Sequence, residues 1–117
     1  MHKKYEWFKI VDAENELTFS ENNLLVVEVN NRKITLARHN DQLFACAYTC
    51  PHASGILSDG YVDGMGNIIC PVHRYKFSLL NGRNISGEGY YLKTYPLMKS
   101  EEGIFIGFEK KGFFDFL

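Results

Sequence analysis

Four residues near the middle of the chain have side chains that can bind metal ions, and they come as two pairs. The residues are Cys50 and His52, with one residue between them, and Cys70 and His73, with two residues between them. A proline follows each cysteine directly, at Pro51 and Pro71. Because proline fixes φ and removes a backbone donor, each pair lies on a partly pre-organised loop. Two such loops can place two thiolates and two imidazoles around one point.

Three kinds of chemistry use cysteine and histidine together. Structural zinc accepts two of each in a tetrahedron, although zinc motifs usually keep both cysteines in one pair and both histidines in the other. A nucleophilic cysteine needs only one histidine, so a second pair would be superfluous. A binuclear iron–sulfur centre can bind one iron through two thiolates and the other through two imidazoles. The alternating order favours this third chemistry, because each loop then gives one ligand to each iron.

The spacing C-x-H, then seventeen residues, then C-x-x-H resembles the motif of Rieske-type [2Fe–2S] proteins. The stretches NGR at Asn81–Arg83 and LKTYPL at Leu92–Leu97 are similar to the closing hairpin of the same family. The resemblance implies that Cys50 and Cys70 bind the inner iron and that His52 and His73 bind the outer one. It also implies that the second ring nitrogens of both histidines reach solvent, where electrons leave.

The resemblance further indicates a low-potential member of the family. In the high-potential branch, an extra cysteine in each loop forms a disulfide, whereas this chain has Gly55 and Val72 at those positions. That branch also has a serine and a tyrosine that donate hydrogen bonds to cluster sulfurs, where this chain has Tyr75 and Phe77. We expect Tyr75 and Phe77 to cover the cluster with few donors, and the potential to lie near the bottom of the range of about −150 to +300 mV.

Short apolar runs separated by turn residues predict an all-β chain of antiparallel strands. The expected strands are Tyr5–Val11, Leu24–Val29, Arg32–Arg38, Leu43–Tyr48, Asn67–Cys70, Tyr75–Leu80, Tyr90–Lys99 and Gly103–Lys110. Turns at Asn30–Asn31 and His39–Gln42 indicate a β-meander with tight hairpins. No window has a sustained 3.6-residue apolar period. We therefore predict a small barrel or sandwich. The resemblance to Rieske proteins implies the Rieske fold, with a cluster-binding subdomain of two loops at about residues 46–80.

Length and composition restrict the class of protein. The 117 residues fit one domain, so residues 1–117 are interpreted as a single Rieske domain. A formal net charge of −1 gives no indication of nucleic-acid or anionic-membrane binding. No run approaches the roughly 18 apolar residues of a membrane span, and the first ten residues lack the apolar run of a signal peptide. Three cysteines, two of them assigned to the cluster, fit a reducing compartment and a cytoplasmic location.

Several other residues receive structural interpretations. We expect Cys46 to be a small buried hydrophobic residue, and His2 and His39 to be exposed. Gly55, Gly60 and Gly64 are predicted to adopt positive φ. The apolar C-terminus, Phe113–Leu117, is expected either to pack on its own barrel or to form a docking patch.

The leading functional hypothesis is an electron carrier that takes single electrons from a flavin-dependent reductase and passes them to an oxygenase-type acceptor. Catalysis then belongs to the partners, because His2 and His39 do not supply the two-histidine, one-carboxylate site of a mononuclear iron oxygenase. Two alternatives stay open. One is the small Rieske subunit of an oxidoreductase such as a nitrite reductase, and the other is a non-redox module that binds zinc.

Overall fold

The computed structural model describes residues 4–52, 54–87 and 89–110, and these residues form three antiparallel sheets. The first sheet has the order β1–β10–β9, with β1 at Tyr5–Val11, β10 at Gly103–Glu109 and β9 at Leu97–Ser100. The second has the order β2–β3–β4–β8, with β2 at Leu24–Val29, β3 at Arg32–His39, β4 at Gln42–Ala47 and β8 at Thr94–Tyr95. The third is β5–β6–β7, at Tyr61–Val62, Asn67–Ile69 and Lys76–Ser78.

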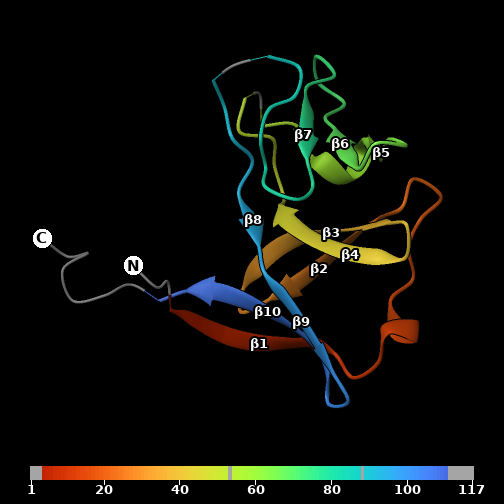
Figure 1. Cartoon of the computed structure of the whole chain (residues 1–117), viewed down its shortest axis with the longest axis vertical. Coiled ribbons are helices and arrows are strands. Elements are labelled where there is room, and N and C mark those ends of the chain that lie inside the picture. The colour runs from red at the N-terminus through yellow and green to blue at the C-terminus, as the bar shows by residue number, and fades with distance from the viewer. Residues whose placement is uncertain (1–3, 53, 88, 111–117) are drawn as a thin grey trace, which may run out of the picture.

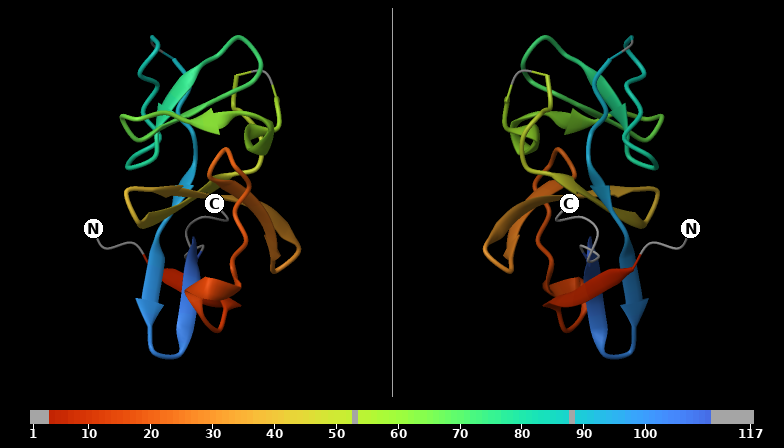
Figure 2. Two further views of the ribbon diagram at one scale, coloured as in Figure 1. Left: turned by 90° about the vertical axis from the view of Figure 1, so that its right-hand side faces the viewer. Right: turned by 90° about the vertical axis from the view of Figure 1, so that its left-hand side faces the viewer.

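The sheets form two lobes: the small lobe contains the sheet β5–β6–β7 with its loops, and the large lobe contains the other two sheets. Figures 1 and 2 show the small sheet β5–β6–β7 with its loops at one end of the molecule, and β1, β10 and β9 at the opposite end. The second sheet lies between them, and β4 leads directly into the small lobe. Two short 3-10 turns, η1 at Glu14–Glu16 and η2 at Leu57–Asp59, complete the described elements. The prediction of an all-β antiparallel fold is confirmed.

Each lobe has its own apolar core. The core between the first two sheets contains Leu36, Ile104, Ile106 and Phe108, which are at most 4% exposed. The second core, called the upper core here, lies beneath the small sheet. It consists of Leu24, Ala37, Cys46, Cys50, Leu57, Ile68, Cys70, Phe77, Leu79 and Leu92. Two of the predicted metal ligands, Cys50 and Cys70, are therefore part of a hydrophobic core.

The two predicted hairpin turns occur in the structure. Asn30 and Asn31 have φ values of 52° and 63°, and Asn40 and Asp41 have values of 51° and 64°. Two consecutive positive φ angles are typical of the type I′ turn, which matches the right-handed twist of the flanking strands. Asparagine and aspartate tolerate this conformation well. Strand β3 continues one residue beyond the predicted end, to His39, which pairs with Gln42.

The single strand predicted for Tyr90–Lys99 is wrong. The structure has two short strands instead, β8 at Thr94–Tyr95 and β9 at Leu97–Ser100, with Pro96 between them. Proline has no N–H for a ladder hydrogen bond, and at Pro96 the chain passes from the second sheet to the first. Strand β5 is not among the predicted strands, because two residues are too few to show a pattern.

The positive φ angles predicted for three glycines are also wrong. The described glycines with positive φ are Gly66, Gly82, Gly89 and Gly103, whereas Gly60 has a φ of −90°. Gly60 is required for a different reason, because a Cβ there would lie 1.8 Å from the carbonyl oxygen of Ile69. The described part of the chain contains no helix long and apolar enough to cross a membrane.

Two consecutive residues without the freedom of glycine adopt positive φ in the second cysteine loop. His73 has a φ of 62° and Arg74 a φ of 56°. For residues other than glycine, asparagine and aspartate, this conformation costs about 1–2 kcal/mol. The loop is therefore closed at the expense of backbone strain.

We predict that Arg74→Gly raises the free energy of unfolding by about 0.5–1 kcal/mol, because relief of the strain exceeds the entropy that glycine adds to the unfolded chain. The thermal midpoint of the metal-loaded protein, followed by circular dichroism, should rise by about 2–5 °C. Arg74→Ala is the matched control, because it removes the charged side chain but keeps the Cβ. Equal midpoints for the glycine and alanine variants would show that strain at this position is not the cause.

Candidate metal centre

The first cysteine loop leaves β4 and returns at Ile56. An isolated bridge between Thr49 and Ile56 closes its base. Inside the loop, the backbone N–H of Cys50 donates to the carbonyl of Gly55 at 2.8 Å, and the N–H of Ser54 donates to the carbonyl of Cys50 at 3.0 Å. The loop therefore turns back on itself within five residues of the cysteine.

The second cysteine loop has the same closing bond. The N–H of Cys70, directly after β6, donates to the carbonyl of Tyr75 at 2.8 Å. In both loops the cysteine N–H thus bonds to the carbonyl five residues later. The histidine lies two residues after the cysteine in the first loop and three after it in the second.

The two thiol groups are buried side by side. Cys50 is 2% exposed and Cys70 is 0% exposed. Burial raises the pKa of the Cys70 thiol to about 11, the N–H of Val72 opposes this rise, and a hydrogen bond between the two cysteine side chains adds to it. The Val72 N–H lies 3.4 Å from the Cys70 sulfur. Because thiolates are disfavoured in this apolar site, a positively charged metal is the species that would stabilise them.

The two imidazoles contact each other and are less buried than the two thiols. The rings of His52 and His73 have centroids 5.6 Å apart at an angle of 74°. His73 is exposed and His52 is half-buried. Within the part of the chain that the structure describes, the buried Nδ1 atom of His52 has no hydrogen-bond partner, which is unfavourable for a polar atom unless another group occupies its lone pair. A neutral imidazole nitrogen is a common metal ligand, so this orphaned atom fits a bound metal.

The four predicted ligands come together as one thiol pair and one imidazole pair. Within residues 4–52, 54–87 and 89–110, no group of three or more histidine, cysteine or acidic side chains is arranged to hold a metal ion. A structural zinc ion takes four ligands in a tetrahedron, whereas a binuclear centre with different ligands on each iron needs two pairs. Two thiols and two imidazoles are the protein ligands that such a binuclear centre takes.

The loops contact each other at the two positions where the high-potential branch has its disulfide. A Cβ on Gly55 would lie 2.8 Å from Cγ2 of Val72 and 3.1 Å from the sulfur of Cys70. The three cysteines are free. Glycine at position 55 therefore allows the two loops to approach each other closely.

Aromatic rings surround the half-buried histidine. Tyr75 stacks on His52, with ring centroids 4.0 Å apart and planes at 16°. Phe77 is 0% exposed in the upper core, and its ring centroid lies 6.4 Å from that of Tyr75. Tyr90 also contacts His52, with ring centroids 5.2 Å apart and ring planes at 67°. The sequence analysis did not identify Tyr90 as a candidate site residue. Pro51 and Pro71 are exposed.

The remaining titratable candidates lie outside this arrangement. Cys46 is 1% exposed, and burial raises the pKa of its thiol to about 12, so it is a protonated core residue as predicted. His39 is half-exposed at the end of β3. His2 and Phe113–Leu117 lie outside the described residues.

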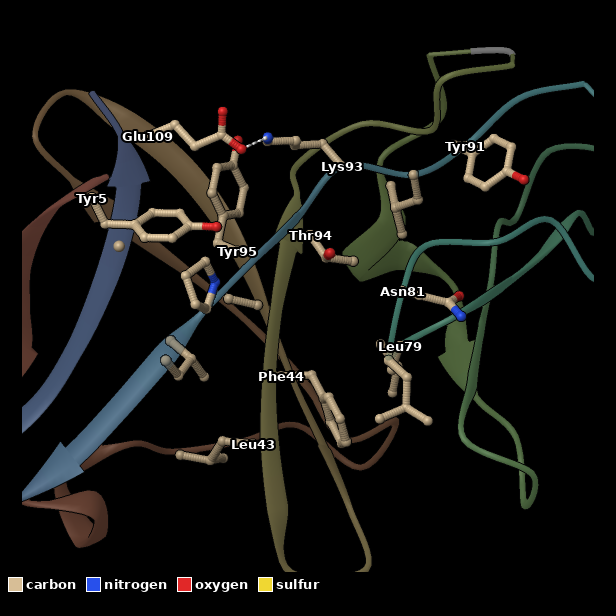
Figure 3. A pocket seen from close by; sticks show the side chains of 16 residues that line it. Tyr5, Leu43, Phe44, Leu79, Asn81, Tyr91, Lys93, Thr94, Tyr95 and Glu109 are labelled. Carbon is tan, nitrogen blue, oxygen red and sulfur yellow. Dashed lines mark ion pairs between the residues drawn. The ribbon is translucent and has the colours of Figure 1, made fainter. Parts of the chain in front are cut away.

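A groove of about 650 Å³ lies between the two lobes (Figure 3). Its wall includes Phe44, Leu79 and Tyr91, and an ion pair between Lys93 and Glu109, at 3.5 Å, lies at one side. None of the four predicted ligands lines the groove. The groove and the candidate metal centre are therefore separate features.

Comparison with known proteins identifies the family. The model of the Rieske [2Fe-2S] domain matches residues 6–96. The ferredoxin component of the alkene monooxygenase system of Xanthobacter autotrophicus is 30% identical over 84 residues, which are 72% of this chain and 69% of that protein. The ferredoxin component of a naphthalene 1,2-dioxygenase system of Pseudomonas aeruginosa is 27% identical over 99 residues, which are 84% of this chain and 94% of that protein.

Solved structures have the same fold. A chain of the complex of reduced oxygenase and oxidised ferredoxin in carbazole 1,9a-dioxygenase superposes with a TM-score of 0.72 and 27% identity, covering 91% of this chain and 96% of that chain. A putative NADH-dependent nitrite reductase small subunit from Mycobacterium tuberculosis superposes with a TM-score of 0.74 at 20% identity, covering 89% and 96% of the two chains.

These comparisons confirm the predicted Rieske fold, the [2Fe–2S] cofactor and the role of a ferredoxin-type electron carrier that serves an oxidoreductase system. The chain belongs to the Rieske [2Fe–2S] family.

Proposed function

We propose that this chain carries single electrons to an oxygenase-type acceptor, and that Cys50, His52, Cys70 and His73 bind its cluster. The observation that carries the ligand assignment is the pairing itself, with two adjacent buried thiols and two adjacent imidazoles, of which His52 is half-buried and His73 is exposed. When bound, the cluster supplies one-electron redox chemistry. The thiolates of Cys50 and Cys70 would hold the inner iron, and the imidazoles of His52 and His73 would hold the outer iron.

The protein residues set the charge of the site. With two thiolate and two neutral imidazole ligands, the oxidised centre is neutral and the reduced centre carries one negative charge. Four thiolates would add two more negative charges in each state, which explains why Rieske centres have higher potentials than all-cysteine centres. The upper core excludes water from the thiolates, and the exposed ring of His73 connects the site to the surface.

The partner assignment is supported by the relatives. Two of them are ferredoxin components of oxygenase systems, and a structural neighbour comes from a complex of an oxygenase with its ferredoxin. The donor, a flavin-dependent reductase, is inferred from the family resemblance alone. We place the carrier in the cytoplasm, since its cysteines fit a reducing compartment. We also assign residues 1–117 to a single domain, with the cluster-binding subdomain at about 46–80.

We predict that replacing any one of Cys50, His52, Cys70 and His73 by alanine abolishes the rhombic EPR signal of the dithionite-reduced, anaerobically purified protein. Each substitution removes one of the two protein ligands of an iron. Iron and zinc should be assayed on the same samples, with two irons per wild-type chain expected.

The controls for this prediction are Cys46→Ala and His39→Ala, which remove the same residue types away from the site. Both should keep the EPR signal and the iron content. Stoichiometric zinc in the wild-type protein, with no EPR signal, would replace the electron-transfer proposal by the zinc-module alternative. Loss of signal in Cys46→Ala alone would contradict the ligand assignment.

We predict a reduction potential near the bottom of the range of about −150 to +300 mV. Phe77 offers no donor to a cluster sulfur, and the ring of Tyr75 is stacked on His52. Adding a hydroxyl with Phe77→Tyr should raise the midpoint by about 30–60 mV, the equivalent of one hydrogen bond of about 0.7–1.4 kcal/mol for a one-electron couple.

Spectroelectrochemical titration measures this potential, and Phe44→Tyr is the control, because Phe44 packs against the same core but also lines the groove. Its midpoint should match that of the wild type. A wild-type midpoint potential above about +100 mV would place the protein in the high-potential branch and contradict the prediction.

We predict that the tagged protein, purified anaerobically from the cells that naturally produce it, elutes without a stoichiometric large chain, because a carrier must dissociate from donor and acceptor in turn. Size-exclusion chromatography with mass spectrometry of the co-eluting proteins measures this. Stable co-purification with a flavin- or haem-bearing chain would instead favour the alternative of an oxidoreductase subunit.

A further inference from the structure

We infer that Tyr75 and Tyr90 form an aromatic clamp that positions the imidazole of His52. The inference rests on the proposed role of His52 as a cluster ligand, and it assigns a task to two side chains that bind no metal themselves. Tyr75 covers one face of the imidazole at 4.0 Å, with the two planes nearly parallel at 16°. The ring of Tyr90 contacts the same imidazole edge-on, with ring centroids 5.2 Å apart and an angle of 67° between the ring planes.

The clamp brings together three segments that are far apart in the sequence. His52 lies on the first cysteine loop, and Tyr75 closes the second one, where its carbonyl accepts the N–H of Cys70 at 2.8 Å. Tyr90 lies on the segment that leads from the small lobe to β8. The orientation of one imidazole is therefore determined by contacts from both of the other segments.

The backbone on both sides of Tyr90 is constrained. Gly89, directly before it, has a φ of 105°, a value that side-chain-bearing residues rarely adopt. Leu92, two residues after it, is 2% exposed, and its N–H donates to the carbonyl of Gly82 at 2.8 Å. Tyr90 is itself 47% exposed, so its packing in the core does not explain its position.

The clamp keeps the Nδ1 atom of His52 directed inward. This atom is buried and has no hydrogen-bond partner among the described residues, so in a freely rotating ring it would turn toward water. Ring contacts on a face and an edge oppose that rotation. The same two rings cover His52 from solvent, and less water near the site disfavours the reduced, negatively charged state.

The test compares Tyr90→Ala with Tyr90→Phe and Tyr91→Ala. Tyr91 is the matched control, because it is the adjacent tyrosine, is 67% exposed, and lines the groove between the lobes (Figure 3). Three quantities are measured on metal-loaded protein: the rate of iron release to a chelator, the midpoint potential, and the nitrogen couplings of the reduced centre by pulsed EPR. Those couplings depend on the orientation of the bound imidazoles.

We expect Tyr90→Ala to release iron about three- to tenfold faster, as the loss of one aromatic contact implies. The substitution should also raise the midpoint potential. In the pulsed EPR spectrum it should broaden the nitrogen coupling of one bound imidazole, that of His52, but not the coupling of His73. Tyr90→Phe keeps the ring and should behave as the wild type, as should Tyr91→Ala. Tyr75→Leu, which keeps an apolar side chain without the stacked ring, should reproduce the changes of Tyr90→Ala and serves as the second variant if the latter does not fold.

The same geometry is measured without metal by nuclear Overhauser contacts between the ring protons of His52 and those of Tyr75 and Tyr90. Their absence in the folded protein, or unchanged nitrogen couplings and iron release in both Tyr90→Ala and Tyr75→Leu, would overturn the clamp. If the contacts are present but the wild-type protein binds no iron, the clamp stands as a structural feature and the proposed cluster function fails.

Discussion

The burial of two thiol groups side by side is the constraint on which the rest of the structure depends. Cys50 and Cys70 belong to the upper core together with Leu57, Ile68 and Phe77. In such surroundings a thiolate is unfavourable, as the raised pKa of Cys70 shows. Positive charge from a bound metal offsets that cost, so metal binding is coupled to the packing of the core. Under the proposed ligand assignment, the cysteines are ligands and core residues at the same time.

The two histidines have different surroundings, although their loops are closed in the same way. Both loops are closed by a hydrogen bond from the cysteine N–H to the carbonyl five residues later. His52, two residues after its cysteine, is half-buried and contacts the rings of Tyr75 and Tyr90. His73, three residues after its cysteine, is exposed and adopts positive φ. Under the proposed ligand assignment, two ligands of the same chemical type therefore differ in exposure.

Local sequence features allowed the hairpins and the candidate ligands to be predicted. The pairs Asn30–Asn31 and Asn40–Asp41 adopt positive φ because their own side chains tolerate it, so no distant contact is required. The spacing within each cysteine loop is equally local. The contact between Tyr90 and His52 depends instead on chain reversals in the small lobe, and no pattern around Tyr90 indicates it. The approach of Gly60 to the carbonyl of Ile69 is also a tertiary contact, which explains why the prediction of positive φ there was wrong.

An electron carrier has two conflicting requirements, and the fold separates them in space. The thiol side of the site is dry and tightly packed, and such an interior changes little when the charge of the site changes by one. An electron must nevertheless reach a partner at the surface, which a fully buried site would hinder. Under the proposed ligand assignment, the exposed imidazole of His73 meets this second requirement, while the core around Cys50 and Cys70 meets the first. A centre with cysteines on one iron and histidines on the other suits this division, because thiolates need the compensation of the metal in an apolar interior and a neutral imidazole is stable in contact with water.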